Sequence, residues 1–179
     1  MSRPDGPLLV IGLGNILLRD EGVGVRVVGA VEALGPAVLP PGTRVVDGGT
    51  LGLDLLPLIE DARALLIVDA VDLRRPPGTI RLFHGDEIHS PLAGHVSPHQ
   101  VGIGDLLAAA RLRGTLPGPV ALIGIQPAQI AIGLGLSEVV EAAVPAAVRT
   151  AVAELRILAA SAVASGPILD RSVATAAMG

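Results

Sequence analysis

The sequence predicts an α/β fold in which a mostly parallel sheet carries helices on both faces. Short apolar runs of strand length recur along the chain, and segments with helical spacing of apolar residues separate most of them. The chain has 179 residues, of which 50% are hydrophobic, so it can bury one substantial core but hardly two. We therefore expect a single domain over residues 1–164 and a loosely ordered tail over residues 165–179.

The first half of the predicted domain alternates strand and helix twice. A continuous apolar run at residues 8–13 predicts a strand buried on both faces. The helical spacing that follows predicts a helix from Asp20, which we expect to cap it, to Leu34. A second strand is predicted at residues 43–47 and a second helix at residues 51–61.

The most apolar run of strand length, residues 64–71, predicts a central strand. A fourth strand is predicted at residues 79–83. The turn between them, residues 74–78, is too short for a crossover helix, so we expect the fourth strand to run antiparallel to the third.

The last part of the domain contains two further helices and one strand. Ser97-Pro98 with Gln100 is a pattern typical of a helix start, and this helix should reach about Arg113. A fifth strand is predicted at residues 119–125. Ser137 is expected to cap a last helix that runs towards Ala160.

Composition excludes several kinds of chemistry and partner. A net charge of −4, scattered basic residues and a single aromatic residue, Phe83, argue against a nucleic-acid surface. The chain has no Cys, and its basic residues are all Arg, so thiol, Schiff-base and lysine phosphate-loop chemistry are excluded. Carboxylate, imidazole and hydroxyl groups remain.

The location expected from the sequence is the cytoplasm. The first residues do not resemble a signal peptide, because no apolar stretch follows Arg3 before the first strand. Mean hydropathy is high, at +0.64, but charged residues interrupt the apolar runs before they could span a bilayer. We expect no membrane partner.

Three side chains are expected at the carboxyl edge of the sheet, where ligands bind in such folds. They are Glu21, Asp69 and His99, an acid, acid and imidazole set that could hold a catalytic metal. A helix amino terminus favours the neutral imidazole that binds metal. Other interpretations stay open: the two carboxyls could share a proton in an aspartic-type dyad, or each residue could serve only its local backbone.

Two other kinds of site are weaker hypotheses. The glycines of residues 12–17, together with Asp47, suggest a nucleotide-binding turn, although Asp47 could instead orient the turn at Gly48 and Gly49. Ser97 near His99 suggests serine hydrolysis, but its hydroxyl is better explained as a helix cap. The remaining histidines are expected to be solvated: His84, His89 and His95.

Several motifs in order resemble the endopeptidases that mature the large subunit of nickel-iron hydrogenases. The resemblance covers residues 8–158, and the motifs that carry it are GLGNILLRDEGVGV at 12–25, DGGTLGLD at 47–54, IVDA at 67–70, SPHQVG at 97–102, IGIQP at 123–127 and GLGLSE at 133–138. It implies a three-layer α/β/α sandwich around a five-stranded sheet with one antiparallel strand.

The resemblance also implies an activity: removal of a C-terminal extension from the hydrogenase large-subunit precursor once nickel has been inserted. The metal-contacting acid, acid and histidine of these proteins match Glu21, Asp69 and His99, although a second Asp often stands in place of Glu21. The nickel is expected to be presented by the substrate, while the isolated protein could bind other divalent metals. The surface at Asp47, Gly48 and Gly49 is expected to help position the precursor.

Overall fold

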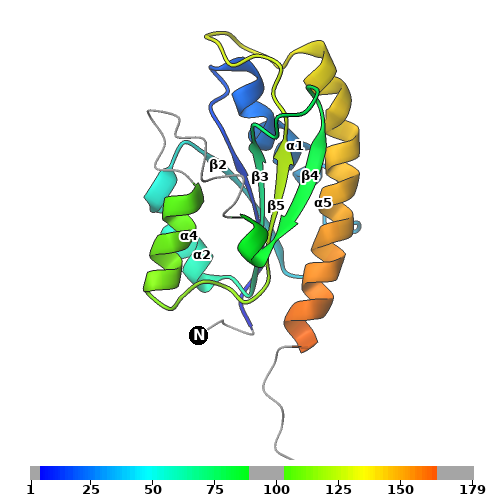
Figure 1. The fold of residues 1–179 in the computed structure, drawn as a ribbon. Coiled ribbons are helices and arrows are strands. Elements are labelled where there is room, and N and C mark those ends of the chain that lie inside the picture. Colours follow the sequence, from blue (N-terminus) through cyan, green and yellow to red (C-terminus); the bar gives the residue numbers. More distant parts are fainter. Residues whose placement is uncertain (1–4, 89–102, 165–179) are drawn as a thin grey trace, which may run out of the picture.

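The computed structural model of this chain describes residues 5–88 and 103–164. Within them one sheet has the strand order β2-β1-β3-β5-β4 (Figure 1). The strands are β1 (Leu8–Leu13), β2 (Thr43–Gly49), β3 (Ala64–Ala70), β4 (Ile80–His84) and β5 (Val120–Ile125). The helices are α1 (Val23–Glu32), α2 (Leu56–Asp61), α4 (Ile103–Leu112) and α5 (Glu138–Ala164), with the 3-10 helices η1 (Arg19–Gly22), η2 (Gly52–Leu55) and η3 (Gly85–Ile88).

The sheet is the middle of three layers. Helices α1 and α5 cover one face, while α2 and α4 cover the other (Figure 1). Successive residues of a strand point to opposite faces, so Leu8 and Val10 join the core under α1 and α5, whereas Leu9 and Ile11 join the core under α2 and α4. The helices predicted on both faces of the sheet, and the α/β/α sandwich that the resemblance implies, are confirmed.

Burial decides which strands are central. The first five residues of β3 are buried, and β3 lies in the middle of the sheet, as predicted. All six residues of β5 are buried as well. In β4 only Phe83 is buried, which suits a strand at the edge.

Strand β4 runs in the predicted direction, but its neighbour is β5. The β3–β5 pair is parallel and the β4–β5 pair is antiparallel, so β4 is opposite in direction to β3 without pairing with it. The physical reason is the apolar surface of β5, which is buried best when β5 is inserted between β3 and the edge strand.

The helix predicted from Asp20 starts differently. The chain first forms η1, and α1 covers only Val23–Glu32. Neither η1 nor α1 has a side-chain cap hydrogen bond, so the prediction that Asp20 caps this helix is wrong. The start of α5 is confirmed, because the carbonyl of Ser137 accepts the N–H of Glu141 at 2.8 Å.

Some predictions fall outside the described residues. They are the helix start at Ser97 and Pro98, and the tail over residues 165–179. The later part of the same helix is α4, where the apolar stripe is buried as expected at Leu106, Leu107 and Ala110. Among the helices of residues 5–88 and 103–164, none combines the length and apolar character needed to cross a membrane.

Candidate functional site at the carboxyl edge of the sheet

The parallel strands β1, β2, β3 and β5 end at the same edge of the sheet. The chain runs from β1 through α1 to β2. It then returns through α2 to β3, which lies on the other side of β1 from β2. Strand order therefore reverses between β1 and β3, the place where open α/β sheets bind ligands. The 3-10 helix η1 follows β1 at this edge and contacts β3.

Three glycines allow η1 and α1 to lie directly against the strand ends. A Cβ at Gly24 would overlap the carbonyl oxygens of Val68 and Leu13, and a Cβ at Gly12 would overlap the carbonyl oxygen of Gly24. Gly14 has φ +126°, and a Cβ there would overlap the backbone of η1. Close backbone packing thus brings η1 to the end of β3.

This packing places two carboxyl groups, Glu21 and Asp69, in electrostatic contact. Glu21 belongs to η1 and is 7% exposed, while Asp69 is half-buried near the end of β3. Loss of hydration and, to a smaller extent, the negative charge of Glu21 raise the pKa of Asp69 to about 7, against the opposing effect of the hydrogen bond from the N–H of Ala70. Burial also raises the pKa of Glu21.

The pair can act chemically in two ways. Two carboxylates with poor hydration repel each other, so they bind a proton more readily than carboxylates in water. The same repulsion is relieved by a divalent cation, for which carboxylate oxygens are suitable ligands. The arrangement therefore fits both a shared proton and a metal ion.

The third predicted ligand, His99, lies outside the described residues. In the part of the chain that the structure describes, no group of three or more His, Asp or Glu side chains is placed to hold a metal ion. The structure brings together Glu21 and Asp69, and the metal site that includes His99 stays a prediction. One local role of Asp69 is confirmed, since its Oδ1 accepts the N–H of Ala70 at 2.8 Å.

The turn at the end of β2 has the geometry expected if Asp47 orients the turn at Gly48 and Gly49. The carboxylate of Asp47 accepts the N–H of Gly49 at 3.0 Å, so Asp47 does orient this turn. The carbonyl of Gly49 then accepts the N–H of Gly14, which ties the turn to the end of β1. Asp47 itself is exposed at the site edge. A role for Asp47, Gly48 and Gly49 in substrate binding stays a prediction.

The glycines do not support the nucleotide-binding interpretation. In a dinucleotide fingerprint, glycines let the backbone approach a pyrophosphate. Here the space beside Gly12 and Gly14 is filled by the chain's own backbone at Gly24 and Glu21. These glycines provide the tight strand exit.

Asp20 has a role that spacing alone did not reveal. It is fully buried, and its carboxylate accepts the N–H groups of Ala128, Gln129 and Ser137 at 2.6–2.9 Å and the hydroxyl of Ser137 at 2.8 Å. Burial by itself would raise the pKa of Asp20, but the hydrogen bonds from Ser137, Gln129 and Ala128 outweigh it and lower the pKa. Asp20 thus clamps the loop after β5 against η1.

Gln126 is a second residue that the sequence analysis did not single out. Its side-chain Oε1 accepts the N–H of Leu73 at 2.6 Å and that of Arg75 at 3.4 Å, while Nε2 donates to the carbonyl of Pro127. Gln126 therefore fixes the connection between β3 and β4 at the site edge. The only sequence signal was its place directly after an apolar strand.

His84 lies at the opposite end of the sheet from the candidate site, where β5 starts. It pairs with Ala121 near the start of β5, and its Nε2 lies 2.9 Å from Oε1 of Glu154 on α5, which is 2% exposed. The ring is half-exposed, so the expected solvation holds only in part. His89 and His95 lie outside the described residues.

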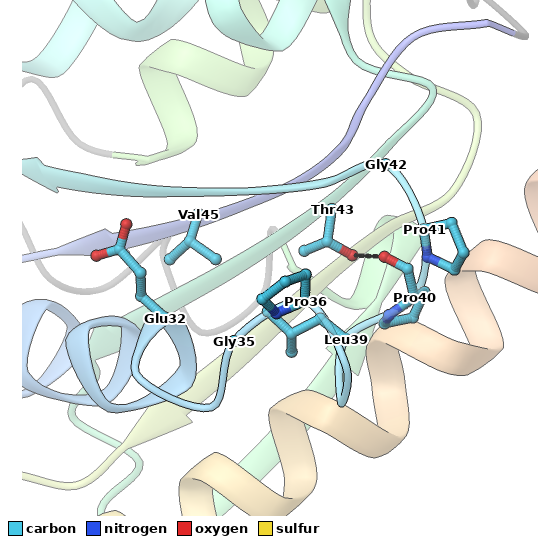
Figure 2. Close-up of a pocket in the computed structure, with 9 residues that line it drawn as sticks. All are labelled: Glu32, Gly35, Pro36, Leu39, Pro40, Pro41, Gly42, Thr43 and Val45. Atoms are coloured by element: carbon cyan, nitrogen blue, oxygen red, sulfur yellow. Dashed lines mark hydrogen bonds between the residues drawn. The ribbon is translucent and has the colours of Figure 1, made fainter.

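A surface pocket near the start of β2 is separate from the site. It has a volume of about 240 Å³ and opens where α1 leads through a proline-rich loop into β2 (Figure 2). Glu32 is the one ionisable residue in its lining, so the pocket lacks the paired groups that acid–base chemistry needs. The lining residues are Glu32, Gly35, Pro36, Leu39, Pro40, Pro41, Gly42, Thr43 and Val45.

Comparisons with known proteins agree on one family. The model of the HycI hydrogenase maturation protease family matches residues 28–154, a range that includes Asp47, Asp69 and His99 and starts after Glu21. The chain is 38% identical to the hydrogenase 2 maturation protease of Escherichia coli K12 over 150 residues, which are 83% of this chain and 90% of that protein.

Two further similarities extend this result. The chain is 41% identical over 152 residues to the hydrogenase expression/formation protein HupD of Rhodobacter capsulatus, covering 83% of this chain and 71% of HupD. Its fold is similar to the solved structure of the hydrogenase maturating endopeptidase HybD from E. coli, with a TM-score of 0.75 and 37% identity. That match covers 83% of this chain and 91% of HybD.

Proposed function

The chain belongs to the hydrogenase maturation protease family, and on this premise we propose that it cleaves the large-subunit precursor of a nickel-iron hydrogenase after nickel insertion. The bond that breaks is the peptide bond before the C-terminal extension, and water supplies the new carboxylate and amine ends. The observation that carries this proposal is the convergence of Glu21 and Asp69 at the reversal point of the sheet, with both pKa values raised.

The nickel in this proposal belongs to the substrate. Glu21 and Asp69 would offer carboxylate oxygens to it, and His99 would offer an imidazole nitrogen, which suits nickel well. Support for the two carboxylates comes from their mutual repulsion, which a cation relieves. Because carboxylates accept many hard ions, the isolated protein should also bind other divalent metals.

An aspartic-type mechanism is the second candidate, and the same pair favours it. A pKa of about 7 for Asp69 allows this carboxyl to hold a proton near neutral pH. The Asp69–Glu21 pair could then act as acid and base on the scissile bond and its attacking water. In this mechanism the nickel of the precursor would report only that the substrate is ready.

The edge of the site provides a place for the polypeptide. Asp47 is exposed on the turn that Gly49 ties to the end of β1, beside the carboxyl edge of the sheet. We propose that this turn positions the precursor.

The proposal includes the cytoplasmic location predicted from the sequence, which cell fractionation would check.

The test is incubation of the purified protein with its precursor, with and without inserted nickel, followed by mass measurement of the product. Nickel-dependent loss of the C-terminal extension is expected. Lack of cleavage by folded protein would reject the activity and favour a metal-binding accessory role. Cleavage of the nickel-free precursor would keep the protease and reject the nickel requirement.

A variant series links the activity to the site. His99→Ala should abolish processing while the protein stays folded by circular dichroism. Asp86→Asn, which alters an acid whose side chain is 95% exposed on η3, is the matched control and should process normally. Normal processing by His99→Ala would remove this histidine from the site.

A further inference from the structure

Two loops at the carboxyl edge pair with each other beside Glu21. The N–H of Gly133 donates to the carbonyl of Leu17 at 2.9 Å, and the N–H of Arg19 donates to the carbonyl of Gly133 at 3.1 Å. These bonds form a parallel bridge between Leu18 and Gly133. Figure 1 shows the loop after β5 beside the loop after β1, at the same end of the sheet.

The paired loops expose large apolar side chains. Their exposed fractions run from 56% to 91%, although core residues of the same kind are almost fully buried. We call this set the apolar rim: Ile16, Leu17, Ile130, Ile132 and Leu134. Apolar side chains exposed together on neighbouring loops mark an interaction surface.

Hydrogen bonds hold the apolar rim in place. Asp20 lies between the two loops in the hydrogen-bond network, accepting from Ala128, Gln129 and Ser137, while its own N–H donates to the carbonyl of Gln129 at 3.2 Å. Because these bonds fix the backbone on both loops, the apolar side chains cannot easily turn into the core. The apolar rim is therefore preorganised for binding.

The charge of the paired loops indicates what would cover them. Residues 15–19 and 128–135 contain one charged residue, Arg19, and no acid, although the whole chain has a net charge of −4. Such a surface fits a neutral, apolar stretch of polypeptide better than a charged ligand. Arg19 is also the first residue of η1, which carries Glu21, so the rim adjoins the element that carries this carboxyl.

We propose that the apolar rim docks apolar side chains of the hydrogenase precursor next to the bond that is cut. The inference rests on the proposed function and adds a recognition surface to it. Docking at the rim would hold the scissile bond at Glu21 and Asp69, so the rim would act mainly on substrate binding. A second copy of this chain is the competing occupant.

The test compares Ile132→Asn/Leu134→Asn with Leu112→Asn. Leu112 is 91% exposed, as Ile132 is, but it ends α4, from which the chain leads to the start of β5 at the opposite edge of the sheet. For the double variant we expect KM for the nickel-loaded precursor to rise about tenfold, with kcat changed less than about twofold, since lost apolar contacts weaken binding. Leu112→Asn should match the wild type in both constants.

Binding and assembly measurements separate the possible failures. If the wild-type protein does not cleave the precursor, the proposed function fails, and the rim is judged by calorimetric binding of the precursor alone. Equal KM, or equal precursor affinity, for the double variant and the wild type would overturn the docking proposal. If the wild type sediments as a dimer and the double variant as a monomer, with unchanged affinity for the precursor, the rim binds a second copy of this chain. That result would also overturn the docking proposal.

Discussion

Glu21 and Asp69 are held where water would stabilise them poorly. Each has a raised pKa, with loss of hydration as the main cause, and the charge of Glu21 acts on Asp69. A fold does not gain stability from two such carboxyls. Carboxyl groups that lower the stability of a fold in this way are characteristic of binding or catalytic sites.

Isosteric removal of either carboxyl should therefore separate activity from stability. Glu21→Gln and Asp69→Asn are each expected to reduce processing at least about 100-fold, because the site loses an acid–base or metal-binding group. Metal-free Asp69→Asn should melt at or above the wild-type temperature, since a carboxylate repulsion is removed. Precursor cleavage assays and thermal melts check both parts. Cleavage at the wild-type rate would remove the altered carboxyl from the site.

Asp20 has the opposite character, although it is adjacent to Glu21. Its hydrogen bonds lower its pKa, so the fold stabilises the charged form. Asp20→Asn would replace one acceptor oxygen by an amide donor, which would face either the N–H of Ser137 or the N–H groups of Ala128 and Gln129. We expect a loss of about 3 kcal/mol in the free energy of unfolding, measured in urea.

The control for Asp20→Asn is Asp86→Asn, in which an exposed carboxyl is changed the same way. The control should change the free energy of unfolding by less than about 0.5 kcal/mol. An equally small effect of Asp20→Asn would show that the clamp contributes little to stability.

At the scale of elements, the packing of α1 against the strand ends depends on glycine. Gly24→Ala would place a Cβ against the carbonyl oxygens of Val68 and Leu13, so α1 must shift. We expect a loss of at least about 2 kcal/mol in the free energy of unfolding, together with reduced processing because η1 moves with α1.

Gly29 provides a matched control in the same helix. A Cβ at Gly29 would meet nothing within 4 Å, so Gly29→Ala should stabilise the protein by about 0.5–1 kcal/mol through its helix propensity. Chemical denaturation of both variants measures the difference. Equal effects of the two substitutions would contradict the close approach inferred at Gly24.

The positions of the strands along the chain were largely predictable from hydrophobic periodicity, but the order in which the strands pair in the sheet was not. The apolar runs predicted all five strands of the described residues within about two residues at each end. The insertion of β5 between β3 and β4 depends on which strand has two apolar faces to bury, and a linear pattern does not give that. The η1 start was also missed, because Asp20 bonds to residues more than 100 positions away.

At the scale of the molecule, the two cores share the same sheet. Leu66 faces α1 and α5, while Ile67 faces α2 and α4, and both are almost fully buried. Damage to either core should therefore weaken one cooperative structure. The single domain over residues 1–164 stays a prediction, which the unfolding of core variants tests.

Leu66→Ala and Ile67→Ala test that cooperativity. Each should cost about 2–5 kcal/mol through lost burial and a cavity, and each should leave one unfolding transition. Denaturant curves followed by far-UV circular dichroism and by hydrogen exchange provide the measurement. Two separate transitions in either variant would contradict a single folding unit.

The sequence by itself determined the class of fold and named the carboxyl edge of the sheet, with Glu21, Asp69 and His99, as the candidate site. These follow from local patterns, because hydrophobic period and chain order fix which strand ends carry acids. Tertiary structure alone decided that Glu21 and Asp69 interact, that Asp20 joins η1 to the loop after β5, and that apolar side chains stay exposed beside them. Burial, pKa and exposure depend on what packs around a residue, and those neighbours come from distant parts of the chain.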